Sequence, residues 1–278
     1  MNDAQWRALQ EFKTDFKSQV SAWQAQIEEA GLLDQLQSLQ KRAADRDGVP
    51  LYSLDTPLVY NSALDDIQKT DDIRIILIGD NPGKDEQLAR NRRYLVGQSG
   101  KIADGFFRKN PELNIDFRKN VLILNKTPLH TAKTKELALI IKEGNPLFAE
   151  IIEESQIRLA RATVRLHRAL YEADDTGNPC KLWLIGYAEL RERGLFSVYR
   201  DALNAAYAEC SARAAPAPIS VSAPSERKSG CASQVFVYQH FSMNRFLIDL
   251  KERSHSSLSL AENIEHVGRA HRKDILGW

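Results

Sequence analysis

Polar side chains able to bind a ligand follow three short apolar runs of the chain. The first run leads into residues 79–84 (GDNPGK), the second ends at Asn125, and the last is followed by His240 and Ser242. A side-chain amide offers a hydrogen-bond donor and an acceptor together, and imidazole is the side chain best suited to exchange a proton near neutral pH. No cysteine and no cluster of paired carboxylates stands beside them, so we expect no metal site.

Residues 79–84 are the most informative of these segments. Gly79, Pro82 and Gly83 predict a tight turn before a helix, where free backbone N–H groups favour an anion. The segment is not a P-loop, because its spacing to Lys84 is one residue short and Asp85 stands where a hydroxyl residue belongs. Taken alone, it is equally compatible with an ordinary turn.

Short strands must position these residues. Continuous apolar runs occupy residues 73–78 (IRIILI), 121–124 (VLIL), 182–185 (LWLI) and 235–238 (VFVY). Continuous runs are typical of parallel strands covered on both faces, and ligands bind beyond the carboxyl ends of such strands. Helical patterns separate the runs, at residues 101–109, 136–142, 149–173, 187–210 and 242–254. The alternation predicts an α/β fold, a three-layer α/β/α sandwich around a central, mainly parallel four-stranded sheet.

The chain divides into two parts in this prediction. Residues 1–48 form an N-terminal helical extension, with an apolar stripe at helical spacing from Trp6 to Ile27, and residues 49–278 form the α/β domain. The stripe is typical of a helix packed on a core, with a partner-binding helix as the alternative. Residues 211–234, rich in Ala, Pro and Ser, are expected to form a flexible surface insertion.

Composition excludes several classes of protein. The 278 residues contain no run of about 18 apolar residues, and the mixed, charged N-terminus does not resemble a signal peptide. The cysteines number three and lack CxxC spacing, which argues against a disulfide framework, a zinc site or an iron–sulfur cluster. We expect a cytoplasmic protein without cofactor or membrane partner.

The near-zero net charge conceals a basic middle segment. The formal charge is +1, yet residues 74–135 hold 13 Lys and Arg against 6 Asp and Glu, whereas residues 1–73 hold 7 against 13. A basic face can attract a polyphosphate regardless of the total charge, although a solvated surface is the plainer interpretation.

The strand-end segments together resemble the uracil-DNA glycosylase superfamily over about residues 57–250. Residues 79–83 (GDNPG) resemble the GxNPG motif of its mismatch-specific and single-strand-selective monofunctional branches, and residues 94–100 (YLVGQSG) its PFVGxAG stretch. Residues 122–129 (LILNKTPL) are similar to the strand whose Asn reads the pyrimidine, and residues 240–242 (HFS) stand where the family has HPS.

The resemblance implies a role for each matching residue. Asn81 would hold the attacking water through its carbonyl oxygen, Asn125 would read uracil O4 and N3–H, and His240 would donate to uracil O2. It further implies base contacts from Gly79, Asp80, Tyr94 and Leu95, and DNA contacts from Pro82, Lys84, Ser99, Lys126 and Ser242. The expected partner is uracil-containing DNA, single- or double-stranded.

Three departures from the family pattern concern the same site. Leu95 occupies the position of the aromatic residue that stacks on uracil, with Tyr94 beside it as a substitute and Phe106 or Phe107 as more remote ones. Phe241 replaces the Pro of HPS, and the following loop lacks the usual Pro/Leu wedge, for which Met243 and Arg245 are the nearby candidates. These departures leave open an altered base preference, a single-stranded substrate or a loss of activity.

Three functions remain open. The first is a monofunctional glycosylase acting on uracil or a related damaged pyrimidine, without lyase activity because no lysine occupies a Schiff-base position. The second is a non-catalytic nucleic-acid-binding or nucleotide-binding protein on the same fold. The third is a small-molecule enzyme that holds a phosphorylated metabolite at residues 79–84.

Overall fold

The computed structural model describes residues 1–174, 177–213 and 230–278. Its centre is a four-stranded, all-parallel sheet in the order β2-β1-β3-β4, which confirms the predicted fold class. The strands are β1 Ile75–Gly79, β2 Val121–Asn125, β3 Lys181–Ile185 and β4 Val235–Tyr238. The helices are α1 Asp3–Glu29, α2 Leu33–Arg46, α3 Ala63–Asp66, α4 Gln98–Lys109, α5 Leu137–Glu143, α6 Pro146–Glu172, α7 Ser197–Arg213, α8 Arg245–Arg253 and α9 Leu260–Leu276.

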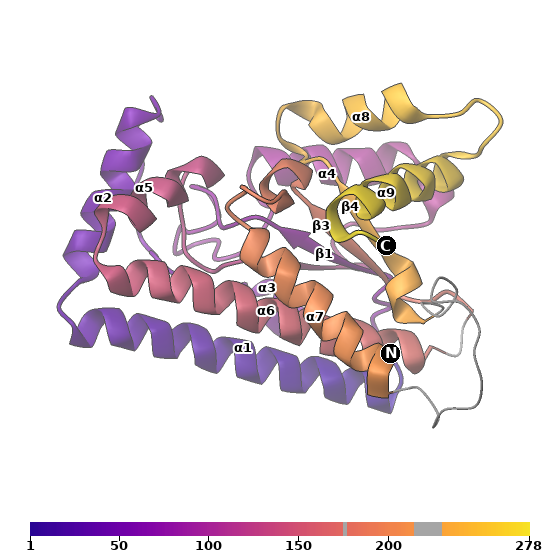
Figure 1. Ribbon diagram of the computed structural model, residues 1–278, viewed down its shortest axis with the longest axis horizontal. Helices are drawn as coiled ribbons and strands as arrows, with labels where there is room; N and C mark the ends of the chain where they lie inside the picture. Colours follow the sequence, from indigo (N-terminus) through magenta and orange to yellow (C-terminus); the bar gives the residue numbers. More distant parts are fainter. Residues whose placement is uncertain (175–176, 214–229) are drawn as a thin grey trace.

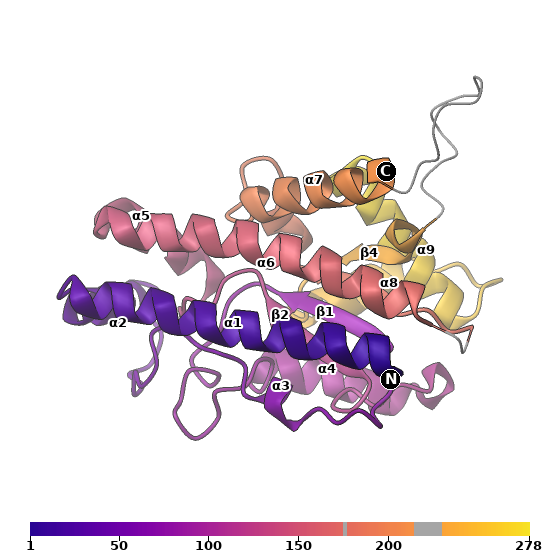
Figure 2. The same ribbon diagram turned by 90° about the horizontal axis from the view of Figure 1, so that it is seen from below.

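Helices cover both faces of the sheet (Figures 1 and 2). On one face, α4 and α8 pack through aromatic side chains, since the ring centroid of Trp183 in β3 lies 5.8 Å from that of Phe107 in α4 and 6.2 Å from that of Phe246 in α8. The helix α9 packs on β4 at the same face. On the other face α6 lies against the sheet and α7 packs along α6. Every residue of β1, β2 and β4 is buried, which explains the continuous apolar runs that predicted these strands.

The N-terminal helices share the core of the α/β domain. The apolar stripe of α1 is buried from Leu9 to Ile27, and these side chains belong to the same continuous cluster as the strands. The indole Nε1 of Trp23 donates to Glu154 of α6 at 2.8 Å. The stripe is therefore part of the core, and α1 lies alongside α6 (Figure 2).

Three helical segments differ from the prediction. Residues 84–91, where the turn at residues 79–83 predicted the start of a helix, form turns and bends, and the next helix begins at Gln98. The helix predicted over residues 187–210 is a 3₁₀ turn, Tyr187–Leu190, followed by α7 from Ser197. The chain reverses between them at Gly194, where a Cβ would lie 2.2 Å from the carbonyl oxygen of Glu189. The terminal helix α9 was not predicted, although Ser259 and Glu262 form a capping box at its start.

The expected insertion at residues 211–234 is described only in part. Residues 214–229, most of the expected insertion, lie outside the described residues, and residues 231–234 form a 3₁₀ turn before β4. Among the described helices none has the length and apolar character needed to cross a membrane. Within the same residues no three His, Cys, Asp or Glu side chains are grouped to hold a metal ion.

Candidate active site at the carboxyl ends of the strands

The parallel register brings the strand-end segments to one edge of the sheet. Gly79 at the end of β1 pairs with Asn125 at the end of β2, and Ile185 at the end of β3 pairs with Tyr238 of β4. The segments that follow these strands, including Asp80, Asn81 and His240, therefore leave the sheet on the same side.

A buried ion pair ties three of the strands together at this edge. The ammonium of Lys126 donates to Asp80 Oδ1 at 2.6 Å, to the carbonyl of Ile185 at 2.6 Å and to that of Gly79 at 3.2 Å. Its side chain is fully buried, so all three ammonium hydrogens have acceptors inside the protein. Lys126, which the resemblance predicts to contact DNA, is instead fully buried and presents no surface to a phosphate.

Gly186 is required by the same ion pair. Its φ is +97°, in the left-handed region, and a Cβ there would lie 2.3 Å from Asp80 Oδ1. A side chain at this position would be strained and would displace the carboxylate from Lys126. Asp80, which the resemblance predicts to contact the base, is instead buried in the ion pair with Lys126 at this edge of the sheet.

The amide of Asn125 is buried and unpartnered. The side chain is 3% exposed, and its Nδ2 has no hydrogen-bond partner. The amide lies over Gly79, where a Cβ would come within 2.5 Å of Asn125 Oδ1. A buried unsatisfied donor costs about 1–3 kcal/mol, and a ligand that supplies an acceptor would recover that cost. Gly79 thus acts by leaving room for the amide.

Asn81 is held by one end of its amide. Its Nδ2 donates to Thr131 Oγ1 at 2.8 Å, with longer contacts of 3.4 Å to the carbonyls of Leu129 and Pro82. Within the described residues no group donates to its Oδ1. The carbonyl oxygen is consequently the end of the amide that is available to a water or ligand.

His240 is arranged as a neutral donor. Its Nδ1 accepts the backbone N–H of Ser242 at 3.0 Å and lies 2.7 Å from the Ser242 hydroxyl. Nδ1 therefore carries no proton, and in the neutral ring the proton is on Nε2. Burial lowers the pKa of His240 below its ordinary 6.5, opposed by the charge of Asp80 and assisted by that of Lys126. Ser242, expected to contact a phosphate, is engaged with this imidazole.

The aromatic side chains near residue 95 face the core. Tyr94 is 1% exposed and its hydroxyl donates to the carbonyl of Val59 at 2.6 Å, so its ring is not free to stack on a base. Phe106 and Phe107 are buried in the helix layer as well. Leu95 has φ +52° and its carbonyl accepts from Arg118 at 2.6 Å. The described residues thus place no stacking aromatic where the family resemblance expects one.

The remaining expected DNA contacts occupy different environments. Pro82 is buried, Ser99 is half-buried in the first turn of α4, and Lys84 is exposed. The expected wedge candidate Met243 is 71% exposed, on a loop where both Met243 and Asn244 have positive φ. Phe241, in place of the family's Pro, is fully buried and packs 4.7 Å from Phe246. Phe246 therefore anchors the loop that carries His240 and Ser242.

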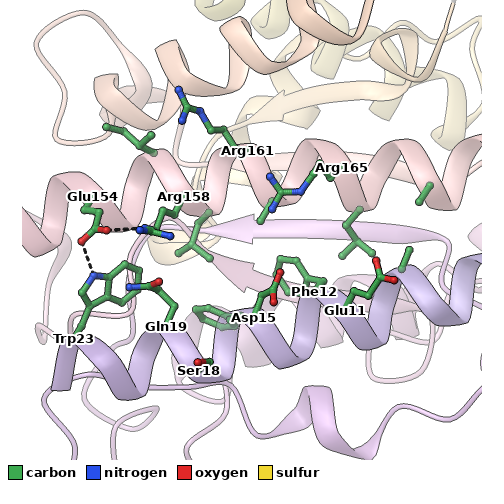
Figure 3. A pocket seen from close by; sticks show the side chains of 17 residues that line it. Glu11, Phe12, Asp15, Ser18, Gln19, Trp23, Glu154, Arg158, Arg161 and Arg165 are labelled. Carbon is green, nitrogen blue, oxygen red and sulfur yellow. Dashed lines mark hydrogen bonds and ion pairs between the residues drawn. The ribbon is translucent and has the colours of Figure 1, made fainter. Parts of the chain in front are cut away.

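Asn81, Asn125 and His240 do not line the cavities of about 890, 560 and 400 Å³. Figure 3 shows one of about 890 Å³ between α1 and α6, with Glu11 and Asp15 on one side and Arg158 and Arg165 on the other. Arg158 is paired with Glu154, which also accepts from Trp23. The Trp23–Glu154 hydrogen bond joins the two helices, and none of the groups predicted to react lines the cavity.

Another cavity, of about 560 Å³, borders the 79–84 segment. Tyr52, Asp55, Lys84 and Arg90 line it. Its charges are mixed, because the carboxylates of Asp55 and Asp85 face the same space as the two cations. This balance does not favour a phosphorylated metabolite, the ligand of the third hypothesis.

Sequence reasoning missed the residues that hold the 79–84 segment. His130 and Thr131 follow the predicted strand. Thr131 accepts a hydrogen bond from Asn81, His130 is hydrogen-bonded to the carbonyl of Pro82, and Tyr52 is hydrogen-bonded to His130. Their position shortly after the LNKTP segment was the only available signal. Comparison of the chain with models of protein families, with curated proteins and with solved structures finds no match.

Proposed function

We propose that the protein is a monofunctional DNA glycosylase that hydrolyses the N-glycosidic bond of uracil or a related damaged pyrimidine. The observation that supports the proposal most is the buried, unpartnered Nδ2 of Asn125 at the same sheet edge as Asn81 and His240. Asn81 and His240 each have one engaged atom and one free hydrogen-bonding atom, and Asn125 has an unpartnered Nδ2. Their free groups are complementary to a pyrimidine edge and a water.

The proposed chemistry assigns one task to each side chain. Asn125 Nδ2 donates to uracil O4 while its Oδ1 accepts from N3–H, which selects a base with that pattern. As the glycosidic bond breaks, its electron pair goes to the base, and His240 Nε2–H donates to O2, where negative charge develops. A water held by Asn81 Oδ1 adds to C1′ and loses a proton to solvent or to the departing base. An amide is not basic at neutral pH, so Asn81 acts by placement.

The exposed groups around this edge support a DNA substrate. Lys84, Arg90 and Arg92 are exposed, and none of the ion pairs among the described residues involves them. Met243 is 71% exposed on a loop where Met243 and Asn244 have positive φ, and an exposed apolar side chain is what a wedge between bases requires. By contrast, Arg93 pairs with Asp66 and Lys135 with Asp47.

The buried Tyr94 favours a second candidate, a nucleic-acid-binding protein without catalysis. A glycosylase gains from an aromatic plate that holds the flipped base, and here Leu95 takes that place. Such a protein would bind DNA through the same basic surface without releasing a base.

One assay separates the candidates. Single- and double-stranded oligonucleotides with one uracil are incubated with the protein, and abasic sites are cleaved by alkali. We expect cleavage, reduced at least about 100-fold by Asn81→Ala and by His240→Ala. His266→Ala, on the exposed face of α9, serves as the matched control and retains activity. No cleavage at stoichiometric protein refutes the glycosylase, and activity that survives Asn81→Ala and His240→Ala refutes the site.

DNA binding is measured separately, by fluorescence anisotropy across a salt titration. We expect log Kd to depend steeply on log salt, and Lys84→Gln with Arg92→Gln to reduce the slope by about two. Binding without cleavage supports the second candidate. A flat salt response contradicts a DNA partner for either candidate.

A further inference from the structure

The loop that carries Asn81 is bonded to the segment after β2 by side chains that do no chemistry themselves. Thr131 Oγ1 accepts from Asn81 Nδ2 at 2.8 Å and donates to the carbonyl of Lys133 at 3.0 Å. A hydroxyl has one hydrogen, and here Lys133 takes it. Thr131 therefore presents only lone pairs to Asn81.

His130 fixes the residue next to Asn81. Its Nδ1 lies 2.8 Å from the carbonyl of Pro82, and its Nε2 lies 2.9 Å from the hydroxyl of Tyr52. A carbonyl only accepts, so Nδ1 carries the proton and Nε2 accepts from Tyr52. The backbone N–H of Thr131 donates to the same Pro82 carbonyl at 3.2 Å. His130 and Thr131 are both buried, 0% and 1% exposed, so these bonds are sheltered from water.

We propose that Thr131 is a positioning residue that sets which end of the Asn81 amide faces the substrate, with His130 and Tyr52 fixing the loop beneath it. The inference rests on the proposed function. In the opposite orientation, Asn81 Oδ1 would meet the lone pairs of Thr131, and its Nδ2 would point at the water. An N–H donor cannot accept a hydrogen bond from the water, so the flipped amide could not direct the water's lone pair towards C1′. The hydroxyl of Thr131 thus selects the productive orientation.

Thr131→Val tests this, because it keeps the shape of the side chain and removes the acceptor. We expect kcat for uracil release to fall about 10- to 100-fold with KM within twofold, since the substrate contacts remain. Thr131→Ser retains the hydroxyl and should restore kcat to within about threefold. A Thr131→Val enzyme with the native kcat overturns the proposal.

A matched variant separates positioning from stability. Thr163 of α6 is also a buried threonine, 1% exposed, and accepts from the hydroxyl of Tyr199 at 3.2 Å. Thr163→Val should lower Tm to a similar extent and leave kcat unchanged. An equal loss of kcat in Thr163→Val would show that the effect of Thr131→Val is structural and would overturn the proposal.

Amide NMR makes the inference independent of activity. In the native protein the side-chain NH₂ of Asn81 is hydrogen-bonded, so its protons should exchange at least about tenfold more slowly than in Thr131→Val, with Thr131→Ser close to the native protein. Unchanged exchange in Thr131→Val overturns the proposal. If exchange responds as expected while native protein releases no base, the proposed function fails and the orientation of Asn81 by Thr131 stands.

Discussion

At the scale of single residues, the site is shaped by glycines as much as by polar groups. Gly79 leaves the space that the Asn125 amide occupies, and Gly186 leaves the space for the Asp80 carboxylate. The carboxylate in turn satisfies Lys126, which joins the ends of β1 and β3. A change at either glycine therefore acts on a polar side chain from another part of the chain.

Gly186→Ala should destabilise the protein by about 3 kcal/mol or more. The change adds left-handed strain and pushes Asp80 away from a buried ammonium, and a broken buried ion pair alone costs about 3–5 kcal/mol. Gly277→Ala is the control, since Gly277 has φ +76° with nothing within 4 Å of a Cβ, and it should cost only about 1–2 kcal/mol. Urea unfolding of both variants measures the difference, and equal losses would contradict a role for the Asp80 contact.

Base release should be independent of pH near neutrality and fall in acid. Burial lowers the pKa of His240 below its ordinary 6.5, so the neutral ring dominates at pH 7. Asp80→Asn removes the charge that raises this pKa and should shift the acid limb of the kcat profile to lower pH. An acid limb above pH 6.5, or one that Asp80→Asn moves upward, contradicts this arrangement.

At the scale of elements, α1 belongs to the structure that supports the site. Phe16 of α1 is 4% exposed and lies 5.5 Å from the ring of Tyr60, which precedes β1 in the chain. Next to Tyr60, Asn61 donates to the carbonyl of Ile123 in β2 and its Oδ1 accepts from the backbone of Tyr94. The packing of α1 is thus continuous with the loop that ends in Leu95.

Phe16→Ala should therefore cost about 3–4 kcal/mol of unfolding free energy. Thr14→Ala, on the exposed face of the same helix, should change it by less than about 0.5 kcal/mol. Chemical denaturation followed by circular dichroism makes the comparison. A near-native stability of Phe16→Ala would support the alternative that this stripe binds a partner.

At the scale of the whole molecule, buried histidines couple stability to pH. Burial lowers the pKa of His130 and of His167 to about 4, and raises the pKa of Glu86 to about 7. Between pH 6.5 and 4 the unfolded chain binds more protons at the two histidines than the folded protein, so their contribution is lost on acidification. The contribution of Glu86 to stability depends on pH in the opposite direction. It is complete below about pH 4.5 and is lost as the pH rises through about 7.

The two histidines outweigh the single glutamate. Each of the three groups contributes a change of about 3 kcal/mol, and the lowered pKa values of His240 and His271 act in the same direction as those of His130 and His167, so stability at pH 4 should lie about 3 kcal/mol or more below that at pH 7. His167→Gln should reduce this difference by about 3 kcal/mol, because glutamine does not titrate in either the folded or the unfolded state. Urea titrations at both pH values test the prediction, which a stability that rises on acidification would contradict.

Local patterns in the sequence were sufficient for the strands and for the segments at their ends. The apolar runs around Ile76, Ile123, Leu184 and Val237 predicted a parallel sheet, because a strand covered on both faces must be apolar at every position. The placement of Asn81, Asn125 and His240 beyond strand ends followed from the same runs. The sequence pattern did not predict helix α9, because its buried face includes Asn263, Gly268 and His271, and these residues interrupt the apolar period.

Only the tertiary structure decided which polar groups are free. Lys126 is basic in the sequence and fully buried in the fold, Tyr94 turns its hydroxyl to Val59, and Asn81 finds its partner in Thr131. These outcomes depend on residues far apart in the chain meeting at one edge of the sheet, which no local pattern encodes. The sequence determined the kinds of side chain available at that edge, and the packing determined which of them remain able to bind a ligand.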